Sequence, residues 1–197
     1  MRKAKVRKQA LEARRSLKPG QVEEKAAAIL SRLQSLPALA DGGTVLSYVS
    51  SKDNEVDTLD LITWLLDQGR VVLVPIALAD RTLEWSRLLS LSDLSRGRFD
   101  ILEPRPERRR IEVPPLGAVV IVPGVAFRPD GYRIGYGAGY FDRFLSAHRG
   151  TRIGLAFDVQ IVESFVPDPH DIPMDCIVTE TRVFQRPRTK LHPVRPV

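Results

Sequence analysis

The sequence predicts an α/β fold, a three-layer α/β/α sandwich built on one largely parallel, mixed central sheet. Apolar, β-branched segments alternate with segments whose apolar residues have helical spacing, an order typical of βαβ units. Residues 119–122 read VVIV, a continuous apolar run of the kind found in strands buried on both faces. The 197 residues, 43% of them hydrophobic, provide the core of one domain and are few for two.

Two helices are expected ahead of the first strand. Residues 3–16 contain no glycine or proline and carry a narrow apolar stripe that includes Val6 and Ala10. Because Pro19 and Gly20 break this helix, we expect the second one over residues 21–36. Its apolar residues recur at helical spacing: Val22, Ala26, Ile29, Leu30 and Leu33.

The middle of the chain predicts three strands and one helix. The strands are expected over residues 44–49, 70–75 and 82–86. Between the first two, Asp57 or Thr58 is the candidate N-cap of a helix, and Gly69 stands just past its end. Residues 88–115 are polar and rich in proline and arginine, which predicts irregular surface excursions.

The last third predicts the strand at 119–122, a helix over 140–148 and strands at 152–157 and 176–179. We find no internal repeat. Residues 1–186 are expected to form a single domain. The basic residues 187–197 contain three prolines and are expected to form a loose tail.

Composition excludes several classes of protein. The longest apolar runs, residues 71–79 and 119–127, contain a proline and fall well short of the ~20 residues that span a bilayer. The basic N-terminus leads into no apolar stretch, so we expect no secretory signal. Cys176 is the single cysteine, which excludes an internal disulfide, and the three histidines are scattered. A soluble, cytoplasmic protein is expected.

The net charge of +6 is unevenly distributed. Residues 1–18 carry +7, residues 182–197 carry +5, and the rest of the chain carries −6. A basic terminal helix serves an anionic small molecule as readily as a phosphate backbone. Charge therefore leaves open both an enzyme for anionic ligands and a phosphate- or nucleic-acid-binding module that uses the basic ends.

The most informative segment is residues 119–142, VVIVPGVAFRPDGYRIGYGAGYFD. It predicts a strand, about sixteen glycine-rich residues and a helix start, and loops of that length inside a domain are usually functional. The alternating glycines at 135, 137 and 139 let backbone N–H groups approach a ligand closely. A helix that starts near Tyr140 favours an anion at its N-terminus. Arg133 adds positive charge, and Asp142 is placed to coordinate phosphate-bound Mg²⁺.

Each of these features also has a plainer interpretation. The glycine spacing fits neither the dinucleotide fingerprint nor the P-loop, and alternating glycines often make only a tight turn. Asp142 alone is a favourable acid near a helix N-terminus. The aromatic residues Tyr136, Tyr140 and Phe141 are commonly core or surface residues, but their position in a glycine loop favours a flat heteroaromatic ligand.

Several blocks, in order, resemble the 5-formyltetrahydrofolate cyclo-ligases, also called methenyltetrahydrofolate synthetases. They are the basic start, NEVDT at 54–58, ILEP at 101–104, VPGVAFRPDGYRIGYGAGYFDRFL at 122–145 and PHDIPMDCIVTE at 169–180. The resemblance implies a CoA-transferase-like α/β sandwich. It also implies ATP- and Mg²⁺-dependent closure of 5-formyltetrahydrofolate to 5,10-methenyltetrahydrofolate, through a phosphorylated formyl group, with release of ADP and phosphate.

The resemblance also implies a nucleotide site. Lys3 and Arg7 match basic residues that bind ATP phosphates; viewed alone, they lie on one face of a helix that is as readily solvated. Arg133 and Tyr140 take catalytic roles. The matching nucleotide-binding loop comprises Arg133, Ile134, Gly135, Tyr136, Gly137, Ala138, Gly139, Tyr140 and Phe141.

Substrate and metal positions follow from the same resemblance. Glu55 matches an acid that binds the donor edge of the pterin, and Val49 lines the folate pocket with Tyr136 and Tyr140. Alone, Glu55 is an exposed loop acid and Val49 a core residue. Asp142 and Asp171 match the Mg²⁺ ligands, although Asp171 by itself is a turn residue. The expected partner is the folate, mono- or polyglutamylated, with no nucleic acid and no membrane, and we expect a monomer.

Three positions depart from the family pattern. Arg128 stands where many relatives have aspartate, Ala138 replaces a glycine or lysine, and Phe141 stands where a second tyrosine is common. These departures keep a third hypothesis open, in which the fold is retained for a shifted ATP-dependent step on a folate-like substrate.

Overall fold

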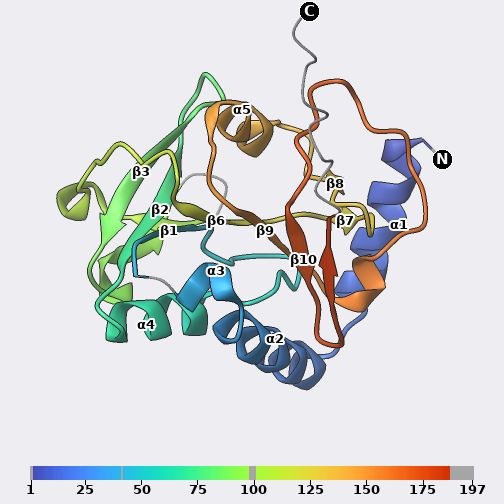
Figure 1. Cartoon of the computed structure of the whole chain (residues 1–197), viewed down its shortest axis with the longest axis horizontal. Coiled ribbons are helices and arrows are strands. Elements are labelled where there is room, and N and C mark those ends of the chain that lie inside the picture. The colour runs from blue at the N-terminus through green and yellow to red at the C-terminus, as the bar shows by residue number, and fades with distance from the viewer. Residues whose placement is uncertain (1, 41, 98–100, 187–197) are drawn as a thin grey trace, which may run out of the picture.

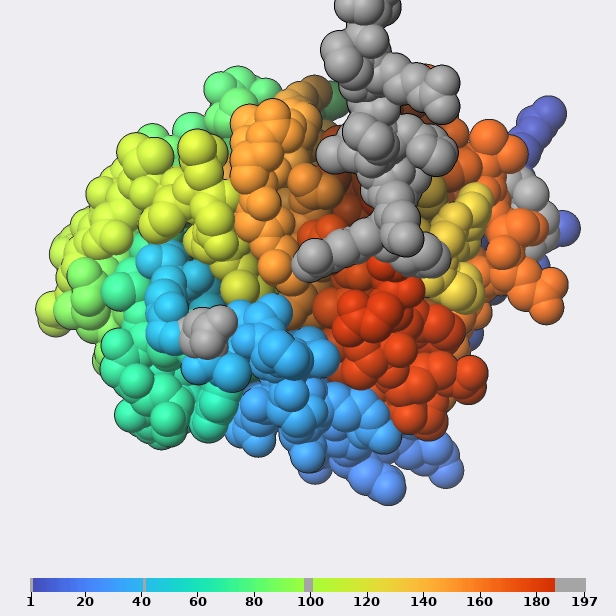
Figure 2. All heavy atoms as spheres, in the orientation of Figure 1, coloured from blue at the N-terminus to red at the C-terminus, as the bar shows by residue number. Residues whose placement is uncertain are grey.

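The computed structural model describes residues 2–40, 42–97 and 101–186, which are coloured by residue number in Figures 1 and 2, so the predicted tail at 187–197 lies outside the described residues. A seven-stranded mixed sheet crosses the molecule, and helices lie on both of its faces (Figure 1). The predicted three-layer sandwich is confirmed. The α-helices are α1 (Lys3–Arg15), α2 (Pro19–Gln34), α3 (Pro37–Ala40), α4 (Leu59–Asp67) and α5 (Tyr140–Ala147).

The sheet has the strand order β11-β10-β9-β6-β1-β2-β3. Its five central strands, from β10 to β2, are parallel, and β3 and β11 join antiparallel at the edges. The bounds are β1 (Thr44–Ser47), β2 (Val71–Ala77), β3 (Leu83–Leu88), β6 (Val119–Val122), β9 (Arg152–Leu155), β10 (Cys176–Val178) and β11 (Val183–Gln185). Two separate antiparallel pairs lie outside this sheet: β4 (Leu94–Arg96) with β5 (Leu102–Pro104), and β7 (Ala126–Phe127) with β8 (Arg133–Ile134).

Alternating side chains divide the core between the two faces of the sheet. On β1, Val45 packs in the cluster that includes α2, α3 and α4, while Leu46 packs in the cluster that includes Leu145 of α5. Both strand residues are fully buried. A third cluster joins Val6 and Ala10 of α1 to the β7–β8 pair, which fixes the N-terminal helix against that pair.

Several element boundaries differ from the sequence-based expectations. The second helix begins at Pro19 and not at Gln21, because proline at the first helical position needs no hydrogen-bond acceptor. The helix α3 and the strand β11 were not predicted, and β3 runs to Leu88. The segment expected to be irregular contains β4 and β5, and the glycine-rich segment contains the β7–β8 pair, so it is not a single long loop.

The predicted limits of α4 are confirmed. Thr58 occupies the N-cap position, and the Asp57 carboxylate accepts the Leu59 N–H at 2.8 Å. Gly69 follows the helix with a left-handed φ of 68°. No helix in the described part of the chain is long and apolar enough to cross a membrane.

Candidate active site

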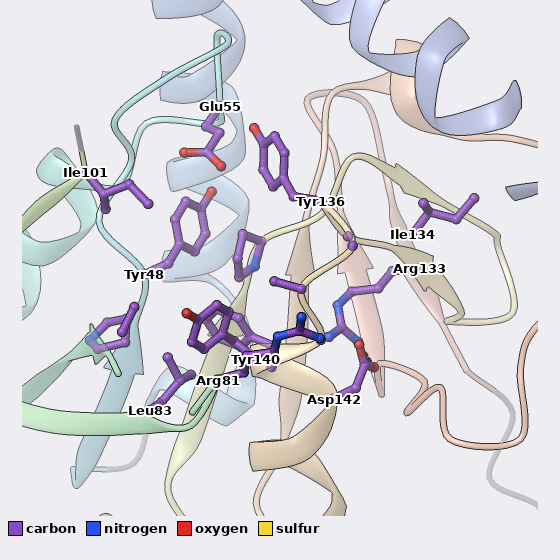
Figure 3. Close-up of a pocket in the computed structure, with 18 of the residues that line it drawn as sticks. Tyr48, Glu55, Arg81, Leu83, Ile101, Arg133, Ile134, Tyr136, Tyr140 and Asp142 are labelled. Atoms are coloured by element: carbon purple, nitrogen blue, oxygen red, sulfur yellow. Dashed lines mark ion pairs between the residues drawn. The ribbon is translucent and has the colours of Figure 1, made fainter. Parts of the chain in front are cut away.

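A cavity of about 640 Å³ opens where β1, β2 and β6 end, between α1, the segment 133–142 and the turn that joins β2 to β3 (Figure 3). Ligand sites of parallel α/β sheets commonly lie at these carboxyl ends. Every site residue that the sequence predicted lines this cavity. They are Lys3, Arg7, Val49, Glu55, Arg133, Ile134, Gly135, Tyr136, Gly137, Ala138, Gly139, Tyr140, Phe141, Asp142 and Asp171.

The segment from Gly135 to Gly139, here called the glycine loop, connects β8 to α5. Gly137 and Gly139 have left-handed φ values of 114° and 75°, which side chains rarely allow. Within the described part of the chain, the backbone N–H groups of Gly137, Ala138 and Gly139 have no acceptor. The N-cap of α5 is Gly139, which supplies no side-chain cap. The loop therefore offers open donors at a helix N-terminus, and these suit an anion.

Arg133 and Asp142 form a nearly buried ion pair at the floor of the cavity. The Arg133 Nη1 lies 3.2 Å from Asp142 Oδ1 and donates to the Ile172 carbonyl at 3.0 Å. The Arg133 side chain is 3% exposed. Burial lowers the pKa of this guanidinium, and the charges of Asp142 and Asp171 oppose that effect. Arg133 is thus a fixed positive charge that two carboxylates hold beside the glycine loop.

Helix α1 brings two more cations to this end of the cavity. Arg7 Nε donates to the Gly135 carbonyl at 2.8 Å. Lys3 pairs with Asp171 and lies 2.5 Å from Asp168 Oδ2. Partial burial lowers the pKa of Lys3, but the two aspartates outweigh it and raise that pKa above its ordinary value.

The residues around Asp142 and Asp171 can hold a divalent cation. In the described structure, Asp142 Oδ2 and Asp171 Oδ1 accept no hydrogen bond. Carboxylate oxygens are the ligands that Mg²⁺ prefers. Asp168, His170 and Asp171 also gather, with candidate ligand atoms within 4.8 Å of one another. A hard cation beside the open N–H groups fits a ligand that carries phosphates.

The other end of the cavity, here called the substrate end, is built from Glu55, Tyr48 and Tyr136. In Figure 3 the three polar groups point toward one another. The Ser51 N–H donates to Glu55 Oε2 at 3.3 Å, and the Lys52 ammonium lies 5.1 Å from the centre of the Tyr136 ring. Burial raises the pKa of Glu55 above its ordinary value. Aromatic faces beside one acid suit a flat ligand with hydrogen-bond donors.

Tyr140 and Phe141 lie between the two ends. The Tyr140 hydroxyl donates to the Leu78 carbonyl at 3.0 Å, which ties the start of α5 to the turn after β2. Phe141 packs edge-to-face on Trp85, with ring centres 6.5 Å apart. The ring of Tyr140 therefore faces the cavity while its hydroxyl is bound to backbone.

The three departures from the family pattern are placed differently. Arg128 pairs with Asp130 and stacks 5.5 Å from the ring centre of Phe165, and it does not line the cavity. Ala138 and Phe141 do line it. Of the three substitutions, only the last two are therefore in contact with the cavity.

Sequence reasoning missed several residues of the site. Tyr48, Arg81, Glu103, Asp168 and His170 also line the cavity. Glu103 and His170 stand inside the ILEP and PHDIPMD blocks, so the blocks were a usable signal. Arg81 lies in the β2–β3 turn with a left-handed φ of 66°, and no sequence pattern predicted its place in the cavity.

A family model and several known proteins match almost the whole chain. Residues 1–180 match the model of the 5-formyltetrahydrofolate cyclo-ligase family. The chain is 34% identical over 182 residues to the 5-formyltetrahydrofolate cyclo-ligase of Escherichia coli strain K12, covering 87% of this chain and 97% of that protein. The protein of the same name from Mycolicibacterium smegmatis is 30% identical over 187 residues, covering 91% and 94%.

Two solved structures share the fold of this chain. The NMR structure of the Aquifex aeolicus 5,10-methenyltetrahydrofolate synthetase superposes with a TM-score of 0.77 at 30% identity, covering 100% of this chain and 96% of that one. A 5,10-methenyltetrahydrofolate synthetase from Mycoplasma pneumoniae, 24% identical, has the same fold with a TM-score of 0.70 over 91% of this chain and 99% of that one.

Proposed function

This chain belongs to the 5-formyltetrahydrofolate cyclo-ligase family, and from that premise we propose that it closes 5-formyltetrahydrofolate to 5,10-methenyltetrahydrofolate with ATP and Mg²⁺. In the proposed reaction the formyl oxygen attacks the γ-phosphorus and ADP leaves. The neighbouring folate nitrogen then attacks the formyl carbon and gives up its proton. The bond between that carbon and the former formyl oxygen breaks, and the oxygen departs as part of the phosphate. Phosphorylation is required because an amide oxygen is a poor leaving group.

The observation that carries the proposal is that one cavity has two chemically different ends. The glycine loop, Arg133 and the two cations of α1 suit phosphates at one end, while Glu55 and two tyrosines suit a pterin ring at the other. A phosphoryl donor and a folate bound in this way meet in the same space. Positioning and charge stabilisation supply most of the catalysis of phosphoryl transfer, so no covalent nucleophile is needed.

We assign the phosphate contacts to this chain's own donors. The open N–H groups of the glycine loop, together with Lys3 and Arg7, hold the polyphosphate. Arg133, fixed by Asp142 and Ile172, presents its charge where the transferring phosphoryl group is expected. Mg²⁺, held by Asp142 and Asp171, would neutralise phosphate charge.

At the substrate end, Glu55 would accept from the N–H donors of the pterin, and Tyr136 would pack on its face. Val49 is 5% exposed and gives the pocket an apolar wall. Tyr140, between the two ends, would bound the reacting centre and help to exclude water. We further propose that the protein acts as a monomer in the cytoplasm, on the mono- or polyglutamylated folate.

The first experiment is to mix purified protein with 5-formyltetrahydrofolate, ATP and Mg²⁺ and to follow the near-ultraviolet band of the methenyl product. We expect the band to grow only with all three components. A flat trace from folded protein would favour the shifted activity, and separate measurements of ATP and folate binding would then show which half of the site is intact.

The Asp142→Asn variant tests the metal assignment. Asparagine retains an oxygen for the Ile172 N–H, so the fold is expected to survive, while Mg·ATP-dependent turnover is expected to vanish. Asp130→Asn is the matched control, because Asp130 pairs with Arg128 away from the cavity. Normal turnover in the Asp142 variant would remove that residue from the metal site.

The same variant also separates the ligase from a phosphate- or nucleic-acid-binding module. Such a module would bind with an affinity that falls steeply with salt and survives the loss of Asp142. Several basic residues of α1 are already committed inside the molecule, since Lys3, Arg7 and Arg14 contact the loops around the cavity. This internal use of the basic helix favours the ligase.

A further inference from the structure

Arg14, on α1, lies behind the substrate end of the cavity and does not line it. Its side chain is 1% exposed and is among the largest fully buried side chains of the described residues. Arginine stays protonated in proteins, so such burial requires hydrogen-bond acceptors. Nε donates to the Asp53 carbonyl at 2.7 Å, Nη1 donates to the Gly124 carbonyl at 3.1 Å, and Nη2 donates to the hydroxyl of Tyr136.

The contact with Tyr136 connects this buried cation to the cavity. Because Arg14 donates to the phenol oxygen, the Tyr136 hydroxyl proton is left free for another acceptor. In Figure 3 that hydroxyl points toward the carboxylate of Glu55. The three groups thus form a sequence from the buried side of α1 to the open cavity: guanidinium, phenol, carboxylate.

All three acceptors of Arg14 are neutral groups, so the positive charge of Arg14 remains to act on Glu55. Burial raises the pKa of Glu55, and the positive charge of Arg14 is the largest influence that opposes this rise. The Ser51 N–H, the Tyr136 hydroxyl and the Lys52 ammonium also lower that pKa. Tyr48 is a further titratable neighbour, and its own pKa is raised by burial and by the charge of Glu55.

We propose that Arg14 is a positioning residue of the substrate site, which orients the Tyr136 phenol and through it holds the Glu55 carboxylate toward the bound folate. Arg14 itself touches neither ligand. The proposal rests on the proposed function in that Glu55 is taken to receive the folate. The effect of Arg14 on the Glu55 carboxyl group is a property of the protein without any ligand.

The first test therefore uses the free protein. The carboxyl ¹³C resonance of Glu55, assigned with a Glu55→Gln variant, is titrated with pH in wild type and in Arg14→Met. We expect the midpoint to move to higher pH in Arg14→Met. The control is Arg15→Met, since Arg15 bonds Asp53 at the surface and does not reach Tyr136, and its midpoint is expected to match wild type. An unchanged midpoint in folded Arg14→Met would overturn the proposal.

Arg14→Lys covers the case in which the methionine variant does not fold, because lysine retains the charge but not the fork of donors. In this variant we expect the Glu55 midpoint to stay near that of wild type, while 5-formyltetrahydrofolate binds about 10-fold more weakly because Tyr136 is no longer held. Wild-type folate affinity in Arg14→Lys would overturn the positioning role.

The second test measures binding of 5-formyltetrahydrofolate and of ATP separately by calorimetry. Arg14→Met is expected to weaken folate binding by about 10- to 100-fold and to leave ATP binding within about 2-fold. The double variant with Tyr136→Phe should bind no more weakly than the weaker single variant, because both changes break one path. Additive losses, or equal losses for both ligands, would indicate a structural role alone.

The two tests fail in different ways. If wild type does not bind the folate, the proposed function fails, while the Glu55 titration still decides the role of Arg14. If wild type binds the folate and the Glu55 midpoint is the same in Arg14→Met, the proposed function stands and the role of Arg14 is refuted.

Discussion

Adding one methyl group at Gly124 is expected to destabilise the β7–β8 pair, which carries Arg133 of the candidate active site. A Cβ built at Gly124 would lie 2.4 Å from Cζ and 2.6 Å from Cε2 of Phe127. Carbon atoms in contact are ordinarily ~3.5–4 Å apart, so the overlap is about 1 Å or more. Phe127 belongs to β7, whose partner β8 carries Arg133, so the clash falls directly behind the site.

The ring and the backbone both have little room to move. Phe127 is fully buried, and its ring also fills the space next to Gly154, where a Cβ would lie 2.6 Å from Cε1. The Gly124 carbonyl accepts hydrogen bonds from Arg14 and from Gln160, which hold the main chain in place. Overpacking costs ~1–3 kcal/mol, and we expect Gly124→Ala to reach about 3 kcal/mol because neither partner can yield.

The assay is thermal and urea unfolding followed by circular dichroism. For a chain of this length, about 3 kcal/mol corresponds to a Tm lowered by roughly 6–12 °C. The control is Gly20→Ala in α2, where a Cβ meets nothing within 4 Å and alanine is expected to stabilise the helix by up to about 1 kcal/mol. The double variant Gly124→Ala with Phe127→Leu should recover at least about 1 kcal/mol relative to additivity. An unchanged Tm in Gly124→Ala, or no recovery in the double variant, would refute the steric argument.

Three further predictions concern pH and the glycine loop. Folate binding, measured by calorimetry, should weaken as pH falls and should do so at a higher pH than an ordinary glutamate would give, because burial raises the pKa of Glu55; a profile that Glu55→Gln leaves unchanged would contradict this. Burial lowers the pKa of His148 below its ordinary 6.5, so the unfolded chain binds the proton more tightly than the folded chain. The free energy of unfolding, measured in urea, should therefore decrease as pH falls below 6.5, and His148→Gln should flatten this part of the curve. Gly137→Ala forces alanine to a φ of 114° at a cost of ~1–3 kcal/mol and should weaken ATP binding, whereas unchanged affinity would show that the loop tolerates a side chain.

Much of the fold was predictable because its signals are local. The run at β6 and the start of α5 at Tyr140 are as the sequence predicted, and the alternating glycines between them form a loop with open donors. The β7–β8 pair was missed because two-residue strands contain no periodicity. The start of α2 was misplaced because Pro19 and Gly20 were interpreted as a break, although proline is favoured at the first position of a helix.

The site residues that stand in motif blocks were predicted from the sequence. The contacts between segments that lie far apart in the chain were not. Lys3 meets Asp168 and Asp171, which lie more than 160 residues further along the chain, and no local pattern announces such a contact. Arg14 was counted among the basic residues of a terminal helix. It is in fact the third member of the buried stripe that begins with Val6 and Ala10. The spacing of four residues was visible, but a charged residue on an apolar stripe is expected to be solvated.

Helix α1 supplies Lys3 and Arg7 to one end of the cavity and places Arg14 behind the other end, and this constrains how its sequence can change. Lys3, Arg7 and Arg14 are separated by four and seven residues, which keeps them within about 40° of one another around the helix axis. Deleting one residue between Arg7 and Arg14 would rotate one end relative to the other by about 100° and shorten the helix by ~1.5 Å. Substitutions on the exposed side of α1 are therefore compatible with the site, whereas insertions and deletions inside it are not. We expect length variation among relatives to accumulate before Lys3 or after Arg15, and to be absent between them.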